Sequence, residues 1–545
     1  MYSSSLPNDL QKTFGEILNY DTATLHEQII QIQKLKIDRQ ESSRWAQRLK
    51  FLDLSKVPDL GVQGKKTIVP RPTLTIPLTS QEDDDKSIEY VAVSWRWVEA
   101  HRVQADGYNT RALFEYYIQR SGEEPYKTDF PDSYMDRVIR FAQSKGIDKI
   151  WIDKDCIFQR DGDEKKYPGE HQCGVQAMDL VYGDSMAVGL LTTCLTKQRD
   201  IDVLGALLAR RIFTKSKDEN SRQLKEDTNV QGILTLIRYI LHDERWDRVW
   251  IFQEDHLAST EMTLLIPHSH SLSKNTHSRY DFGDVDGELK VNLAGFRKAV
   301  TMFCLACSKS GEQESLKDIM DKVKQYNLYD TKTTTTLRVL DDVSSRSTKN
   351  EEDRLAIFAN ALRFKYRLNI SDVSPFDISD KYSMSVAFLV LVLINGEIFN
   401  NNINMLDNIM AYTLRSYLER VQNEIDSPGP GYQLTYIDHC RFSDPEICDQ
   451  GVKTKGLLWK LQTSAILRLD LGDREQLRRL HARRSTREKL SERDKEAIIL
   501  LADKLERDRQ TKKLSKFLRI QVKLDRPGKN HKKSTKYILD NLNPL

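Results

Sequence analysis

The residues with the greatest capacity for chemistry lie in one stretch, residues 147–188. There a short apolar run ends on the carboxylate of Asp153 and continues through Cys156 to Gln159. In open α/β sheets, ligands bind just beyond the carboxyl ends of the strands. A strand that delivers a carboxylate, a thiol and an amide to that edge is therefore a candidate site. The alternative interpretation is a buried strand followed by a polar turn.

An acidic loop follows this turn and carries two more candidate carboxylates, Glu164 and Glu170. Beyond the loop, Val175, Met178 and Tyr182 recur at intervals that place them on one face of a helix. The pattern thus predicts a strand, a polar loop at the carboxyl edge of the sheet and a helix, in that order.

Two flanking elements must position this stretch. Residues 90–93 form an apolar strand that runs into Ser94, Trp95 and Trp97, and residues 133–145 form a helix that Gly146 ends. Strand, helix and strand in that order predict a right-handed crossover and a parallel pair of strands. Ser94 and Asp153 should then open on the same edge of one sheet, beside a further strand at residues 186–191.

Three segments in order resemble motifs of the fungal heterokaryon-incompatibility (HET) domain. They are YVAVSWRW at residues 90–97, WIDKDCIFQ at residues 151–159, and RVWIFQEDHLA at residues 248–258. The segment DRLAIFA at residues 353–359 is similar to a downstream segment common in these proteins. The resemblance covers about residues 50–365.

The alternation of strands and helices predicts an α/β fold, and HET domains have been likened to TIR domains. We therefore expect a TIR-like or flavodoxin-like three-layer domain with a mostly parallel sheet, followed by a mainly helical C-terminal region. The expected divisions are a helical segment at 1–55, the α/β domain at 56–267, a helical accessory region at 268–470, and a basic helical tail at 471–545.

The resemblance implies a module for non-self recognition and programmed cell death, acting through self-association or other cell-death signalling proteins. Under that interpretation Asp153, Gln253 and Glu254 are buried groups that fix loops. We also expect Gln253 or Glu254 to approach the 153–159 turn to about 3 Å.

The alternative function is hydrolysis of NAD, as in TIR-like enzymes, with a carboxylate that steadies an oxocarbenium-like centre. The catalytic candidates are then Glu164 or Glu170, with Asp153. The substrate-binding candidates are Ser94, Trp95, Trp97, Cys156, Gln159, Gln253 and Glu254. A diverged, inactive member is a third interpretation. No cofactor is expected, with NAD entering only as a substrate.

Composition limits the remaining classes. The chain has 545 residues, a net charge of +3 and seven cysteines, which favours free thiols in a reducing, cytoplasmic compartment. Its longest apolar run, residues 386–394, is about half the ~20 residues that span a bilayer. Cys304 and Cys307 have the spacing of metal ligands but lack a second such pair, so no metal site is expected.

The charge is distributed unevenly. Residues 471–545 contain 22 Lys and Arg against 11 Asp and Glu, so the tail carries +11 and the first 470 residues carry −8. Such asymmetry suggests contact with something acidic, but the interpretation that we favour is a solvated, charged helix. Interleaved charges and the lack of an aromatic platform argue against nucleic acid, although the basic tail leaves that partner open.

Overall fold

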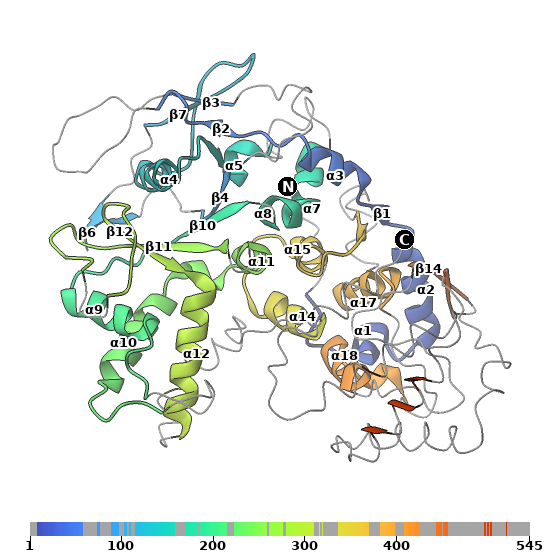
Figure 1. Ribbon diagram of the computed structural model, residues 1–545. Helices are drawn as coiled ribbons and strands as arrows, with labels where there is room; N and C mark the ends of the chain where they lie inside the picture. Colours follow the sequence, from blue (N-terminus) through green and yellow to red (C-terminus); the bar gives the residue numbers. More distant parts are fainter. Residues whose placement is uncertain are drawn as a thin grey trace. The chain divides into compact units, whose positions relative to one another are not determined.

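The structure is a computed structural model, and it describes the chain in segments separated by gaps (Figure 1). The described residues are 8–57, 73–76, 89–97, 103–105, 108–110, 115–158, 169–183, 185–214, 223–258, 261–275, 279–309, 316, 319, 336–369, 382–397, 408–423, 443–449, 451–455, 495–496, 499–500, 502–503 and 519. The chain divides into two compact units, of which the first comprises Met1–Gln422 with Arg441–Thr454.

A nine-stranded sheet forms the centre of the first unit. In spatial order its strands are β12 (Glu288–Asn292), β11 (Thr263–Pro267), β10 (Met186–Leu190), β4 (Val91–Ser94), β9 (Lys149–Trp151), β2 (Leu52–Asp53), β3 (Thr73–Ile76), β7 (Tyr117–Arg120) and β8 (Tyr126–Lys127). β4 is buried along its whole length, as expected for a strand covered on both faces. The predicted neighbours β10, β4 and β9 are adjacent and parallel, which confirms that expectation.

The sheet as a whole is mixed, so the expectation of a mostly parallel sheet holds only at its centre. β11, β10, β4 and β9 are mutually parallel, and β3 is parallel to β7. The other four pairings are antiparallel. β2, which precedes the first motif in the chain, lies between β9 and β3 and runs antiparallel to both. β8 and β12 are edge strands that run antiparallel to β7 and β11.

Helices cover both faces of the central strands (Figure 1). α4 (Asp132–Ser144) joins β4 to β9, whereas α8 (Met178–Gly183) and α11 (Val249–Ala258) lie on connections that run in the opposite direction. Right-handed crossovers in opposite directions place their helices on opposite faces. The α/β architecture is therefore layered, and its likeness to TIR or flavodoxin folds stays a prediction.

The remaining elements of the HET-like region flank this sheet. They are β5 (Val103–Ala105), β6 (Tyr108–Thr110), α5 (Asp153–Cys156), α7 (Glu170–Gln176), α9 (Gln198–Leu208), α10 (Val230–Leu241), the 3₁₀ turn η2 (Glu244–Asp247) and α12 (Leu293–Lys309). Asn229 caps α10 through its side chain, and Gly146 ends the α4 segment with a positive φ of 69°.

A second apolar core is built by helices from both ends of the first unit. Its elements are α1 (Phe14–Leu18), α2 (Thr22–Gln33), α14 (Thr336–Ser345), α15 (Asp353–Ala361), α17 (Met384–Ile394), η5 (Ile409–Ala411) and α18 (Leu414–Asn423). α17 is apolar all round and buried, and β1 (Lys36–Asp38) pairs with β13 (Tyr366–Leu368) beside it. The N-terminal helices therefore belong to the helical core.

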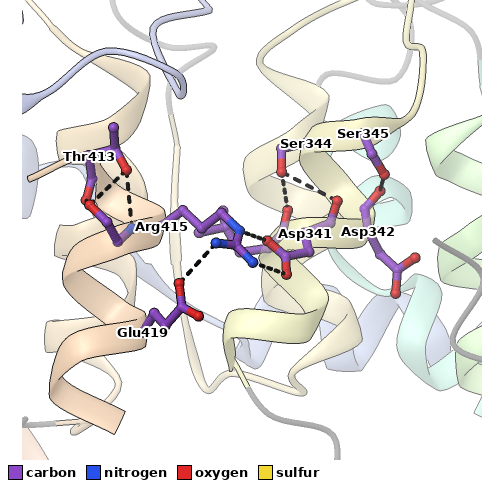
Figure 2. Close-up of polar contacts among 9 residues, drawn as sticks. Asp341, Asp342, Ser344, Ser345, Thr413, Arg415 and Glu419 are labelled. Atoms are coloured by element: carbon purple, nitrogen blue, oxygen red, sulfur yellow. Dashed lines mark hydrogen bonds and ion pairs between the residues drawn. The ribbon is translucent and has the colours of Figure 1, made fainter. Parts of the chain in front are cut away.

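α18 also meets α14 through charged groups (Figure 2). Arg415 donates to Asp341 at 2.7 and 3.3 Å and to Glu419 at 2.9 Å. These side chains are about half exposed, so the contact contributes little to stability and mainly orients the helix.

A few elements complete the description. α3 (Gln40–Ala46) packs on α7, and β14 (Ser443–Cys448) pairs with β15 (Gly451–Lys455). The second unit comprises Asn423–Cys440 and Lys455–Leu545, and most of the basic tail lies outside the described residues. Within that unit Arg519 pairs with Asp503.

Candidate functional site

The carboxyl edge of β4 and β9 carries the centre of the candidate site. Trp95 Nε1 donates to Asp153 Oδ1 at 3.0 Å, and Trp97 Nε1 donates to Asp153 Oδ2 at 2.9 Å. Because β4 and β9 are parallel neighbours, Ser94 and Asp153 leave the sheet on the same edge, as predicted. Asp153 thus fixes the orientation of both indole rings.

Glu254 closes the site from α11. Its Oε2 accepts a hydrogen bond from Ser94 Oγ, and only 7% of the residue is exposed. Burial, reinforced by the charge of Asp153, raises the pKa of Glu254 to about 8. Burial also raises the pKa of Asp153 above its ordinary value. Two carboxyl groups on one edge therefore share a setting that favours a proton on Glu254 at neutral pH.

Trp97 is the solvent-exposed part of the site, with 38% of its surface exposed. Lys154 Nζ lies 4.8 Å from the centroid of its ring, and Arg248 Cζ lies 6.0 Å away. Lys154 also pairs with Asp129 at 3.0 Å, and Arg96 of the first motif pairs with Glu244 of η2. The rim of the site is thus an aromatic surface with cations beside it.

Gln253 faces away from this rim. It is fully buried, and its Oε1 accepts from Asn360 Nδ2 at 3.1 Å. The same Nδ2 donates to the Val175 carbonyl at 2.8 Å, so Asn360 of α15 ties α11 to α7. The predicted direct bond between the third motif and the 153–159 turn stays a prediction, and the bond seen for Glu254 is to Ser94.

Cys156 lies inside the turn after β9. Burial raises the pKa of its thiol to about 12, and its Sγ accepts from the Ile152 amide at 3.4 Å. The neighbouring Asp155 is also buried, accepts from Thr128 Oγ1 at 2.8 Å, and has a pKa raised to about 6 by burial. At neutral pH Cys156 is therefore a protonated, structural thiol, and no nucleophilic role follows for it.

Only one of the three candidate site residues in and before the acidic loop, Glu170, lies among the described residues. Gln159 and Glu164 lie outside the described residues. Glu170 begins α7 and forms an ion pair with Lys50 at 3.2 Å. Lys50 in turn lies 4.1 Å from the centroid of the Phe158 ring, close to the second motif. The catalytic assignments of Glu164, Glu170 and Asp153 all stay predictions.

Three residues of this region were missed from the sequence. Arg245 donates to the Ser94 carbonyl at 2.8 Å and pairs with Asp255, and both are buried. Tyr182 Oη donates to the Val93 carbonyl at 3.0 Å. Asp255 lies within the third motif and Arg245 lies three residues before it, so the available signal was two charged residues close to buried apolar ones.

Metal ligands and membrane-spanning helices were sought among the described residues. Among the described His, Cys, Asp and Glu residues, no group of three or more could hold a metal ion. Cys304 and Cys307 are both buried in α12. Within the described parts of the chain, the helices are too short or too polar to cross a membrane.

Comparison with known families places the three motifs in one domain. Residues 90–254 match the family model described as heterokaryon incompatibility protein (HET). The chain carries a HET domain. No curated protein and no solved structure matches it.

The HET match begins at Tyr90, one residue before β4, and ends at Glu254, in the middle of α11. Ser94, Asp153 and Glu254 therefore all lie within the matched segment, whereas Asn360 lies beyond it. The HET domain in this protein is completed by residues that its own motifs do not include.

We expect Asp153→Asn to loosen the two tryptophans. An amide presents an N–H₂ group where one indole now finds an acceptor, so one buried donor loses its partner. The tryptophan emission should shift to the red and become easier to quench with a soluble quencher. Asp129→Asn is the matched control, because its side chain is 75% exposed. Equal spectra for the two variants would contradict the assigned role of Asp153.

Proposed function

We propose that this protein acts in non-self recognition as a heterokaryon-incompatibility-type signalling protein, and that its HET domain triggers programmed cell death. The observation that carries the proposal is the joining of the three motifs at one edge. Ser94 bonds Glu254, and Trp95 and Trp97 both bond Asp153. Mutual hydrogen bonding of this kind builds a rigid patch rather than a set of independent groups.

The surface of that patch is Trp97 with Lys154 and Arg248 beside it. A half-exposed tryptophan with neighbouring cations is typical of protein contacts, where Trp and Arg are enriched. We infer that this surface meets a second copy of the chain or another cell-death signalling protein in the cytoplasm.

Inducible expression of the full chain in a fungal host tests this proposal. The wild type should arrest growth, and Trp97→Ala should lose at least tenfold in killing at equal protein levels. Tyr239→Ala is the matched control, since Tyr239 is also an exposed aromatic residue but lies on α10. The proposal would be contradicted if the host grew normally while it expressed the unmodified chain, or if Trp97→Ala and Tyr239→Ala lost the same amount of killing activity.

The Glu254–Asp153 pair favours a second candidate, hydrolysis of NAD. Nicotinamide leaves NAD as a neutral base, so cleavage of this glycosidic bond needs no proton from an acid. It needs a carboxylate that stabilises positive charge on the sugar until water adds and releases its proton to solvent. Asp153, fixed by two indoles, suits that role, and Glu254, with its raised pKa, can donate a hydrogen bond to a ribose hydroxyl. The resemblance implies Glu164 or Glu170, with Asp153, as the catalytic carboxylates, whereas this candidate keeps Asp153 and adds Glu254, which the sequence placed among the substrate-binding residues.

Release of nicotinamide from NAD by the purified full chain tests the second candidate. We expect Asp153→Asn to lower the rate at least ~100-fold, the usual scale for loss of a charge stabiliser. Glu254→Gln should have a smaller effect, because glutamine still donates a hydrogen bond. Glu124→Gln, at an exposed position, should leave the rate unchanged. No release by the wild type would remove this candidate and leave the signalling proposal standing.

A further inference from the structure

One buried arginine is attached to the candidate site without reaching its surface. Arg245 lies in the η2 turn after α10 and is 0% exposed. Its Nη1 donates to the Ser94 carbonyl at 2.8 Å, and its Nη2 bonds the carboxylate of Asp255. Its own amide donates to Asp243 Oδ1 at 3.0 Å. The guanidinium therefore connects the end of β4 to α11.

The sheet leaves space for this guanidinium at Gly189. A Cβ added at Gly189 would lie 2.7 Å from Arg245 Nη2 and 3.0 Å from Leu264 Cδ2. Gly189 is not among the glycines with positive φ, so the backbone conformation does not require glycine there. Glycine within a strand marks a close approach by another group, and here that group is Arg245.

The charge of Arg245 is balanced by residues of the motif itself. Asp255, which directly follows Glu254, also lies 3.6 Å from Arg297 of α12. A fully buried guanidinium is tolerated only when it is paired and hydrogen-bonded. Its Nη1 bonds the Ser94 carbonyl and its Nη2 bonds Asp255, whereas its buried Nε has no hydrogen-bond partner among the described residues. Ser94 is one partner of the Ser94–Glu254 hydrogen bond, and Asp255 directly follows the other.

We propose that Arg245 is the positioning residue that holds Ser94 Oγ against the carboxyl group of Glu254. The guanidinium fixes the Ser94 backbone from one strand end and Asp255 from the helix, so the hydroxyl and the carboxyl stay in register. This role rests on the proposed function only because that function is what assigns Glu254 to the functional site. The bond itself can be tested without any activity.

The charged and titratable groups around Glu254 come from four elements. They are Asp153 after β9, Tyr182 on α8, Arg245 in η2 and Asp255 on α11. Arg245 and Ser94 lower the pKa of Glu254, while burial, Asp153 and Asp255 raise it. Removing Arg245 takes away a cation and weakens the hold on the Ser94 donor. Both changes act in the same direction and favour the protonated form.

The experiment compares Arg245→Gln with Arg137→Gln in the full chain. Arg137 is a matched control because it too is buried, donates to two backbone carbonyls, those of Leu191 at 2.8 Å and Leu265 at 2.9 Å, and pairs with Glu288. The titration of Glu254 is measured by unfolding each protein from pH 6 to 10, with and without Glu254→Gln.

We expect Arg245→Gln to raise the proton affinity of Glu254 at least tenfold, which is one pH unit. Arg137→Gln should lower stability without moving that titration. The same titration in both variants would overturn the proposal and leave Arg245 with a purely structural role. Because no turnover is measured, the result is independent of whether the protein cleaves NAD or signals.

A second variant covers the case in which Arg245→Gln does not fold. Gly189→Ala crowds the guanidinium while every side chain at the site remains. It should shift the Glu254 titration in the wild type and have a smaller effect when Arg245→Lys, a thinner side chain, is also present. Additive effects of the two substitutions would contradict the proposed contact between them.

Discussion

Replacing Glu254 by glutamine should abolish a fall in stability that the wild type shows between pH 6.5 and 8. The folded protein holds a proton on Glu254 up to about pH 8, whereas the unfolded chain releases it near the ordinary value of 4.5. Stability from this group is therefore complete below pH 4.5 and is lost as pH rises through 8. Each pH unit between those values lowers the free energy of unfolding by ~1.4 kcal/mol.

From pH 6.5 to 8 the expected loss is therefore ~2 kcal/mol, measured as the difference between wild type and Glu254→Gln in denaturant unfolding. Glutamine resembles the protonated acid and still accepts from Ser94, so the two proteins should be similarly stable only near pH 4.5. The wild type should fall increasingly below Glu254→Gln as the pH rises from there to 8.

The pH window excludes the other buried groups. Asp155 and Asp342 have pKa values raised by burial to about 6, and burial lowers the pKa of His256 to about 4. These groups act mainly below pH 6.5 and are the same in both proteins. Glu124→Gln, at an exposed position, serves as the control for the substitution itself. A flat wild-type profile over this window would show that Glu254 is ionised in the fold.

The second large effect concerns the boundaries of the folded unit. A fragment of residues 56–267 should show no cooperative thermal unfolding and should bind a hydrophobic dye. It lacks β2, which lies between β9 and β3, so the sheet would be cut in two. It also lacks α15 and α17, and so leaves Phe252 and Val249 of α11 without their apolar partners. Each such exposure removes a few kcal/mol from a marginally stable domain.

The matched control is a chain truncated after residue 470. Residues 455–545 belong to the second unit, and the tail from 471 carries the excess of positive charge. We expect this chain to keep the thermal midpoint of the full protein. Cooperative unfolding of the 56–267 fragment at that same midpoint would show that the α/β region folds alone. A large loss on removing the tail would show that the tail contributes to the core.

Local pattern and handedness determined the centre of this protein. Apolar runs at residues 90–93, 150–152 and 186–191, with helices between them, predict parallel neighbours, because right-handed crossovers leave few alternatives. The same rule brings Ser94 and Asp153 to one edge. The helix at 133–145 followed from periodicity and differs from the observed bounds by one residue at each end.

Tertiary packing alone decided the rest. The bonds from Ser94 to Glu254 and from Gln253 to Asn360 join residues that are 160 and 107 positions apart. Whether such side chains meet depends on how α11 crosses the sheet and on what covers its outer face, and no local period encodes either. The same is true of Arg245, whose place depends on the space left by a glycine in another strand. Sequence periodicity reports which face of an element is buried, but only the packed structure decides which partner that face meets.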